Sequence, residues 1–284
     1  MENILEINDL TRKFKHFELK NISFKLPKGF VMGLIGPNGA GKTTTLKLIM
    51  NFMCKNDGEI KVFGLDNIEN EREIKDKIGF IYGEGMFNPY DTAKSIGKTA
   101  KMLYSSWEQE KYSNYLTKFN IPQKTKVGEM SKGTQMKLSI AVALSHNAEL
   151  LLMDEPTAGL DPISRREFLD MIYDFMQDEN KGVIFSTHIT SDLERIADYL
   201  TCINNGEIVF SESRDVILEK YGVVKCRKGL LKEEHRELFV DIQENRFGVE
   251  ALTTNKELIR EFYGEDVVID EPSIEDVMCH MVKK

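Results

Sequence analysis

The segment GPNGAGKTT, from Gly36 to Thr44, carries the residue types that hold a phosphate group. It fits G-x-x-x-x-G-K-[ST], follows the apolar run 30–35 and opens a helical pattern. Its glycines let backbone N–H groups turn inward around a phosphate, and the helix start adds partial positive charge. We expect Lys42 to reach the β- and γ-phosphates of a nucleotide and the Thr43 hydroxyl to bind Mg²⁺. A chance glycine-rich turn is the alternative, and the strand–loop–helix context disfavours it.

Two adjacent carboxylates end a second apolar segment, LLLMDEP. At the carboxyl end of a buried strand, Asp154 can approach the same Mg²⁺. Glu155 can hold and polarise a water molecule in line behind the γ-phosphate. A pair of this kind is usually a solvated turn. The four apolar residues before it, downstream of a phosphate loop, favour the chemical role.

A third segment, EMSKGTQMK, opens a long helical pattern with small and polar residues. Ser131 can cap this helix or bind an anion, and Gly133 permits close backbone approach. Exposed N–H groups and the helix dipole then form a second anion site. An ordinary capped helix would explain the same residues if the segment stood alone.

The bulk composition excludes several function classes. The chain has 284 residues and a formal net charge of −8, and this acidic balance argues against a nucleic-acid partner. Its four cysteines show no C-x-x-C spacing, which indicates reduced thiols in a cytosolic protein. We find no signal peptide and no apolar run long enough to span a bilayer. If the protein acts at a membrane, another chain must span it.

Strand and helix patterns alternate along most of the chain, and the strands FVMGLI, LLLMD and GVIFS are nearly continuous apolar runs. Such strands are buried on both faces, which indicates a parallel α/β core. The stretch from Asp91 to about Asn120 is predicted to be helical, and the block 91–147 interrupts the alternation. The segment YLTCINNGEIVFSE predicts a hairpin that turns at Asn205-Gly206. Residues 222–284 are predicted to form a small C-terminal α+β domain.

The motifs GPNGAGKTT, MSKGTQMK, LLLMDEPTAGLD and STH occur in the order found in ATP-binding-cassette (ABC) ATPases, and the resemblance covers about residues 3–210. It implies an α/β P-loop NTPase core with an N-terminal antiparallel β subdomain. This nucleotide-binding domain would span residues 1–215, with an inserted helical subdomain at about 84–147. The small C-terminal domain follows it.

The resemblance also implies roles for individual residues. Phe14 would stack on adenine, although core packing is an alternative. Glu155 would be the general base and His188 the switch that hydrogen-bonds the γ-phosphate. Asp161 would communicate across a head-to-tail dimer, or simply cap the next helix. Ser131 and Gly133 of one subunit would contact the ATP of the other. The ATP-binding loop would comprise Gly36, Asn38, Gly39, Ala40, Gly41, Lys42, Thr43 and Thr44.

The sequence departs from the family pattern in two places. The usual signature L-S-G-G-Q is replaced by a segment with Lys132 and Thr134, and the glutamine follows one place late. The family glutamine that binds Mg²⁺ aligns with Gly83, so the role is either absent or filled by Glu84 as a third metal ligand beside Thr43 and Asp154. A solvated loop charge at Glu84 is the alternative.

These features predict an ATP- and Mg²⁺-dependent ATPase subunit of an ABC transporter, most similar to bacterial ABC-2-type export ATPases. Expected partners are a separate transmembrane permease, docking near residues 83–110, and a second ATPase subunit in a homodimer or heterodimer. The protein would then be cytoplasmic and peripheral on the inner face of the membrane. The alternative is a soluble ABC ATPase acting on ribosomes or DNA. A non-hydrolysing cassette is disfavoured because Lys42, Asp154, Glu155 and His188 are all present.

Overall fold

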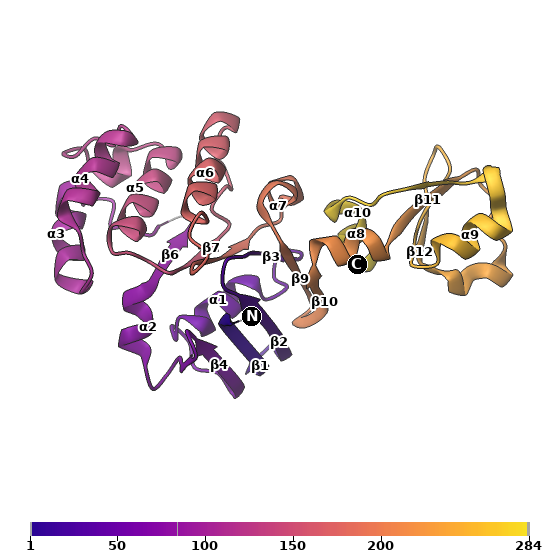
Figure 1. Cartoon of the computed structure of the whole chain (residues 1–284), viewed down its shortest axis with the longest axis horizontal. Coiled ribbons are helices and arrows are strands. Elements are labelled where there is room, and N and C mark those ends of the chain that lie inside the picture. The colour runs from indigo at the N-terminus through magenta and orange to yellow at the C-terminus, as the bar shows by residue number, and fades with distance from the viewer. Residues whose placement is uncertain (1, 84, 283–284) are drawn as a thin grey trace.

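The computed structural model describes residues 2–83 and 85–282. The molecule is elongated, with a block of helices at one end, sheets in the middle and a small sheet at the other end (Figure 1). Within the described residues, no helix is long and apolar enough to cross a membrane.

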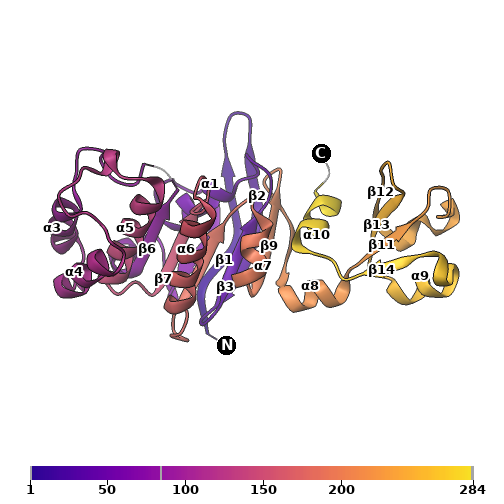
Figure 2. The ribbon, with the colours of Figure 1, turned by 90° about the horizontal axis from the view of Figure 1, so that it is seen from above.

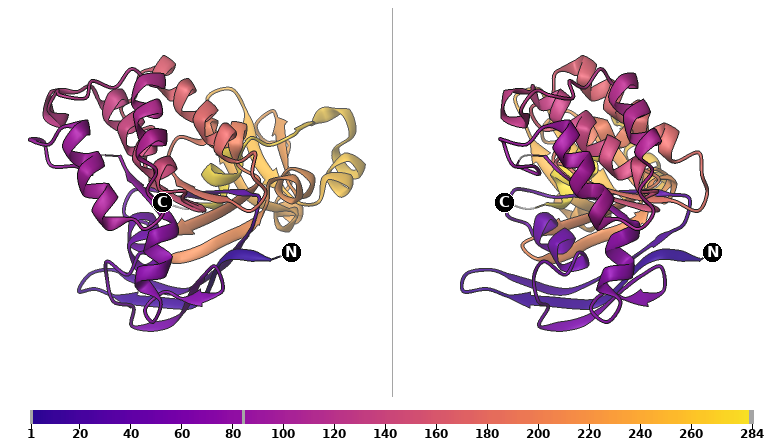
Figure 3. Two further views of the ribbon diagram at one scale, coloured as in Figure 1. Left: turned by 60° about the vertical axis from the view of Figure 1, so that its left-hand side comes forward. Right: turned by 90° about the vertical axis from the view of Figure 1, so that its left-hand side faces the viewer.

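An antiparallel sheet forms the N-terminal part, in the order β2-β1-β4-β5. One face of β2 is buried through Ile22, Phe24 and Leu26, as their alternation predicts. Figure 3 shows these strands, in indigo, and the helices α3–α5 on opposite sides of the molecule. The strands are β1 (Asn3–Lys13), β2 (Glu18–Pro27), β4 (Asp57–Val62) and β5 (Leu65–Asp66).

The central sheet has the order β10-β9-β3-β8-β7-β6, and its neighbours are parallel except for the β9–β10 hairpin. That hairpin turns at Asn205 and Gly206, both with positive φ, as the sequence predicts. Parallel order brings the carboxyl ends of β3, β6, β7 and β8 to one edge. The strands are β3 (Val31–Ile35), β6 (Ile78–Tyr82), β7 (Leu150–Asp154), β8 (Gly182–Ser186), β9 (Tyr199–Asn204) and β10 (Glu207–Ser213).

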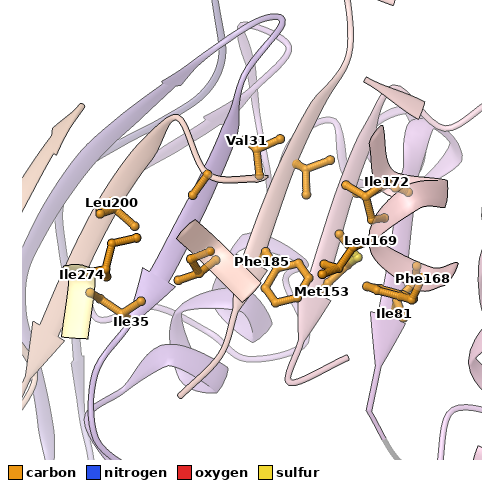
Figure 4. Close-up of a cluster of buried hydrophobic side chains, with 14 of the residues drawn as sticks. Val31, Ile35, Ile81, Met153, Phe168, Leu169, Ile172, Phe185, Leu200 and Ile274 are labelled. Atoms are coloured by element: carbon orange, nitrogen blue, oxygen red, sulfur yellow. The ribbon is translucent and has the colours of Figure 1, made fainter. Parts of the chain in front are cut away.

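Helices cover this sheet, and their apolar side chains pack against those of the strands. Figure 4 shows side chains of β3, β6, β7 and β8 packed against Phe168, Leu169 and Ile172 of one helix, with Ile274 from near the end of the chain in the same cluster. These apolar residues hold the strand ends, and therefore the site, in a fixed arrangement. The helices beside the sheet are α1 (Lys42–Ile49), α2 (Glu71–Lys77), α6 (Pro162–Phe175) and α7 (Thr190–Ile196).

The helical block has its own apolar cluster, which includes Ile96, Tyr112, Leu116 and Leu138. The predicted continuous helical stretch from Asp91 is in fact interrupted. The chain becomes extended at Tyr104, whose ring stacks on His146 at 3.8 Å between centroids. The block contains α3 (Ala93–Leu103), α4 (Gln109–Lys118), the 3-10 turn η1 (Val127–Glu129) and α5 (Lys132–Ser145).

The C-terminal part is an antiparallel sheet in the order β12-β13-β11-β14, and one of its faces packs on Ile259 and Tyr263. Its last helix, α10, returns to the middle of the molecule and packs against α7 (Figure 2). The elements are α8 (Arg214–Lys220), β11 (Gly222–Cys226), η2 (Glu233–Leu238), β12 (Phe239–Glu244), β13 (Val249–Thr253), α9 (Lys256–Tyr263), η3 (Gly264–Asp266), β14 (Val268–Asp270) and α10 (Ile274–Met281). The α/β fold class is confirmed, and the domain division at 215–222 stays a prediction.

Candidate functional site

The loop between β3 and α1 requires glycine at two positions. A Cβ atom at Gly36, where φ is 146°, would lie 2.0 Å from the carbonyl oxygen of Ile203. Gly41, with φ of 121°, precedes α1, and among the described residues no side chain caps that helix start. The N–H groups of the first turn of α1 are therefore left to the loop and to an anion. Asn38 and Gly39 are exposed at the loop tip, and Ala40 is buried where its carbonyl accepts from the N–H of Gly206 at 3.0 Å.

Lys42 is buried, with 6% of its side chain exposed, and it points back over the loop. Its Nζ donates to the carbonyl oxygen of Gly36 at 2.7 Å. The same atom lies 3.6 Å from Oε1 of Glu155. The ammonium group thus stands between the phosphate loop and the carboxylate that follows β7. Thr44 is half-buried in the first turn of the same helix.

Asp154 is held by hydroxyl groups from two other elements. Its Oδ2 accepts from Oγ1 of Thr43 at 2.7 Å, and its Oδ1 accepts from Oγ of Ser186 at 2.6 Å. The sequence prediction missed Ser186, although a polar residue at the end of the apolar strand GVIFS is a visible signal. Carboxylate and hydroxyl oxygens are hard ligands that suit Mg²⁺, which takes one or two protein oxygens and fills its octahedron with phosphate and water. The Thr43 hydroxyl and the Asp154 carboxylate therefore fit a Mg²⁺ ion that takes its other ligands from phosphate and water.

Glu155 and His188 come from neighbouring strand ends and meet there. Oε2 of Glu155 lies 2.7 Å from Nδ1 of His188. The backbone of Glu155 has φ of 49°, a region that non-glycine residues rarely adopt, and its N–H donates to the carbonyl oxygen of Ser186 at 2.9 Å. This conformation aims the carboxylate toward Lys42 and His188. Strain at such a position is a frequent property of functional sites.

Gly83 lies beside the same backbone. Its N–H donates to the carbonyl oxygen of Asp154 at 3.0 Å, and a Cβ atom on it would lie 2.6 Å from the carbonyl oxygen of Glu155. Position 83 therefore has no room for the side chain of the family glutamine. The neighbouring Glu84, predicted as its replacement, lies outside the described residues.

Aromatic residues lie at the turn between β1 and β2. Phe14 is 38% exposed, and the guanidinium of Arg12 lies 5.2 Å from its ring centroid. The sequence prediction did not include Phe17, yet its ring lies 3.2 Å from where a Cβ atom of Gly41 would be. The two phenylalanine rings are 6.1 Å apart. Phe17 thus lies directly against the phosphate loop, and Phe14 lies on its outer side.

Ser131, Gly133 and Asp161 lie where α5 and α6 begin. Oγ of Ser131 accepts from the N–H of Thr134 at 3.2 Å and caps α5. A Cβ atom on Gly133 would lie 2.7 Å from Oγ of Ser164 in α6, so glycine allows the two helix starts to meet. Asp161 accepts from two N–H groups of α6, and hydrogen bonds from the Ser164 hydroxyl and then its N–H lower the pKa of that carboxyl.

Gln135, which stands one place late for the family signature, has a local role. Its Nε2 donates to the carbonyl oxygens of Val127 at 3.1 Å and Met130 at 3.0 Å. The amide therefore closes the turn η1 that precedes α5.

Comparison with known proteins agrees with this arrangement. The family model described as ABC transporter matches residues 19–158. The bacitracin transport ATP-binding protein BcrA of Bacillus licheniformis is 31% identical over 69% of its length and 74% of this chain. The lantibiotic transport ATP-binding protein SrtF of Streptococcus pyogenes is 34% identical over 92% of its length and 75% of this chain. The uncharacterized ABC transporter ATP-binding protein YdbJ of Bacillus subtilis is 30% identical over 89% of its length and 94% of this chain.

A solved structure of an ATP-binding subunit of an ABC transporter superposes with a TM-score of 0.69 at 26% identity. The match covers 75% of this chain and 91% of that one. The fold, the residues at the strand ends and the similar proteins all point to the same family. The chain belongs to the ABC transporter family, in which it is an ATP-binding ATPase subunit.

Proposed function

We propose that this chain hydrolyses ATP in the cytoplasm, on the inner face of the membrane, as the motor subunit of an ABC exporter. Export is supported by the relatives BcrA and SrtF, whose names give bacitracin and lantibiotic transport. The observation that carries hydrolysis is the position of the Glu155 carboxylate. It lies 2.7 Å from His188 and 3.6 Å from Lys42, in front of the phosphate loop.

In this mechanism the loop N–H groups and Lys42 bind the β- and γ-phosphates of ATP. Glu155 orients a water molecule and accepts its proton as the water oxygen attacks the γ-phosphorus. The bond between that phosphorus and the oxygen bridging to ADP breaks, and ADP and phosphate are released. His188 contacts the carboxylate through Nδ1 and hydrogen-bonds a γ-phosphate oxygen through its other ring nitrogen, an arrangement that requires a proton on both nitrogens.

Thr43 and Asp154 would hold Mg²⁺, with Ser186 orienting the carboxylate of Asp154. When bound, the ion neutralises developing charge on the phosphate oxygens. The hydroxyl groups of Thr43 and Ser186 each hold one oxygen of this carboxylate. They would keep it in place to receive the ion.

Two partners complete the proposed transporter. A second ATPase subunit would place its Ser131 and Gly133 on the ATP bound by the first, and Asp161 would lie between the two sites. A separate transmembrane permease would dock on the helical block near residues 83–110. ATP binding would close the dimer, and hydrolysis would reopen it.

The variant Glu155→Gln tests this function. It keeps the shape of the side chain and removes the base, so phosphate release from ATP should fall by about 10²–10⁴-fold. ATP binding should persist, and sedimentation should show an ATP-stabilised dimer. Glu149→Gln is the matched control, because that carboxylate is partly exposed and pairs with Lys77. Normal turnover in Glu155→Gln would remove Glu155 as the base.

The alternative of a soluble ABC ATPase on ribosomes or DNA is not favoured by the relatives, which are transport proteins. The two functions make opposite predictions for copurification. Affinity purification of the full chain from its own cells should recover a membrane protein with several spans. Recovery of ribosomes without any membrane protein would favour the alternative.

A further inference from the structure

Two contacts of equal length join the loop after β7 to the segment that runs from His188 into α7. The first is the contact of Glu155 with His188. The second lies beside it, where Oγ1 of Thr157 donates to Oδ2 of Asp192 at 2.7 Å. Thr157 follows Glu155 by two residues, and Asp192 follows His188 by four. The two contacts therefore connect the same pair of segments.

The two contacts differ in their exposure to water. The side chains of Glu155 and His188 are 24% and 52% exposed, so water competes for their atoms. Thr157 is fully buried, and Asp192 is 2% exposed. A hydrogen bond from a hydroxyl to a carboxylate is strong and directional when it is buried. The buried contact therefore holds the two segments more firmly than the exposed contact does.

Asp192 is also fixed by a third element. Nε of Arg165, in α6, is buried, makes no hydrogen bond in the described structure and lies 3.9 Å from Oδ1 of Asp192. The guanidinium charge compensates the buried carboxylate, whose other oxygen serves Thr157. Asp192 thus ties α6, α7 and the loop after β7 at one buried point.

The opposite side of α7 is held as well. Oγ1 of Thr190 donates to Glu275 of α10 at 3.4 Å, and Glu194 accepts from the N–H of Ile274 at 3.3 Å. This short helix is therefore fixed between Asp192 on one side and α10 on the other. With α7 fixed, the hydrogen bond from Thr157 to Asp192 helps to locate the loop, together with the backbone hydrogen bond from Glu155 to Ser186.

We propose that Thr157 and Asp192 are positioning residues, which hold the Glu155 carboxylate at the distance from His188 that hydrolysis requires. The inference rests on the proposed role of Glu155 as the base. Thr157 and Asp192 touch neither ATP nor water in this scheme. They act by setting the geometry of the pair that does.

The test compares Thr157→Val with Thr157→Ser in the full chain. Valine keeps the volume of threonine but has no hydroxyl, so kcat for ATP should fall about 10- to 100-fold, the effect of a small misplacement of a catalytic group. The Kd for ATP should stay within about twofold, because the phosphate loop is unchanged. Serine keeps the donor and should restore most of kcat.

Thr253→Val is the matched control for loss of a buried threonine hydroxyl. Thr253 is also fully buried and donates to the carbonyl oxygen of Leu238 at 2.6 Å, in the C-terminal sheet. Its variant should lose thermal stability and keep kcat. If Thr157→Val fails to fold, the triple variant Thr157→Val/Asp192→Ala/Arg165→Met removes both partners and the guanidinium that faces them, so that no polar group of this buried contact is left unpaired. The same fall in kcat is expected from it.

A double-mutant comparison separates this inference from the function beneath it. In a Glu155→Gln background, Thr157→Val should add no further loss of kcat, because it acts through Glu155. Wild-type kcat in Thr157→Val, or an equal loss in Thr253→Val, would overturn the positioning role alone. Normal turnover in Glu155→Gln would instead overturn the proposed base, and this inference would fall with it.

Discussion

At the scale of single residues, Lys42 concentrates the positive charge of the phosphate site. Its buried ammonium group donates a hydrogen bond to the carbonyl oxygen of Gly36 and lies close to the Glu155 carboxylate. These partners make a buried charge tolerable. Phosphate oxygens are stronger acceptors than a carbonyl, so ATP binding offers Lys42 a better partner than its own loop does.

Lys42→Ala should therefore weaken ATP binding. Loss of a charge-assisted hydrogen bond costs about 1.5–3 kcal/mol, which corresponds to a rise in Kd of roughly ten- to a hundredfold. Titration of a fluorescent ATP analogue measures this. Lys47→Ala, on the same helix with its Nζ 5.7 Å from the Tyr82 ring centroid, is the control and should bind as wild type. An unchanged Kd in Lys42→Ala would contradict the phosphate-loop assignment.

The sequence alone located the residues whose types are fixed by local chemistry. A phosphate loop needs its glycines, lysine and threonine at set spacings along one segment, so Gly36 to Thr44 could be read directly. The contacts of Phe17 and of the pair Thr157–Asp192 could not, because they depend on which segments become neighbours after folding. Gln135 shows the same limit, since its two acceptors lie in the preceding turn and no motif specifies them.

At the scale of elements, helix α5 is anchored at both ends. Ser131 caps its start, and His146 follows its last turn. The His146 ring is buried, stacks on Tyr104, and its Nδ1 lies 3.2 Å from the carbonyl oxygen of Asp76 at the end of α2. Burial lowers the pKa of His146 to about 4, against an ordinary value of 6.5. A neutral imidazole therefore joins the helical block to the rest of the molecule.

This anchor makes stability depend on pH. Between pH 6.5 and 4 the unfolded chain binds a proton at His146 and the folded chain does not, so the free energy of unfolding falls as pH falls. We expect His146 to contribute a loss of about 2 kcal/mol between pH 7 and pH 5. Urea unfolding at the two pH values measures it. His146→Phe, which keeps a ring against Tyr104, should reduce the pH dependence by that amount, and variant His16→Phe at an exposed position should not. An unchanged dependence in His146→Phe would refute the assignment.

Element types were predictable, and their ends were less so. The continuous apolar runs of β3, β7 and β8 and the turn at Asn205-Gly206 predicted the central sheet and its hairpin, because burial on both faces and a positive-φ turn leave clear patterns. The break at Tyr104 was not predictable. Tyr104 stacks on His146, which lies far along the chain, and no local pattern indicates that contact.

At the scale of the whole molecule, the C-terminal part both has its own core and completes the central one. Val224, Phe239 and Ile259 form a separate cluster in the small sheet. Ile274 and Val277 of α10 are 2% and 1% exposed and belong to the central cluster with Phe185 and Leu200. The C-terminal part of the sequence is rich in charged residues. Nothing in that pattern indicated that α10 would pack against the central sheet.

Ile274→Ala should accordingly destabilise the cassette itself. Removing this buried side chain is expected to cost about 2–5 kcal/mol of unfolding free energy. Urea unfolding followed by near-UV circular dichroism reports on it. Ile163→Ala is the matched control, since Ile163 is 73% exposed on α6 and its loss should change stability by no more than about 0.5 kcal/mol. Equal stability of the two variants would show that α10 is only loosely attached.

The return of α10 has a consequence for biosynthesis. The strands and helices of the cassette leave the ribosome before the C-terminal sheet, and the sheet leaves before α10. Until α10 arrives, the face of the core that receives Ile274 and Val277 stays open to water and to other chains. The nascent ATPase therefore exposes an apolar, aggregation-prone surface until the C-terminal part has been translated and folded. Helix α10 can dock only after every nucleotide-binding motif has been translated.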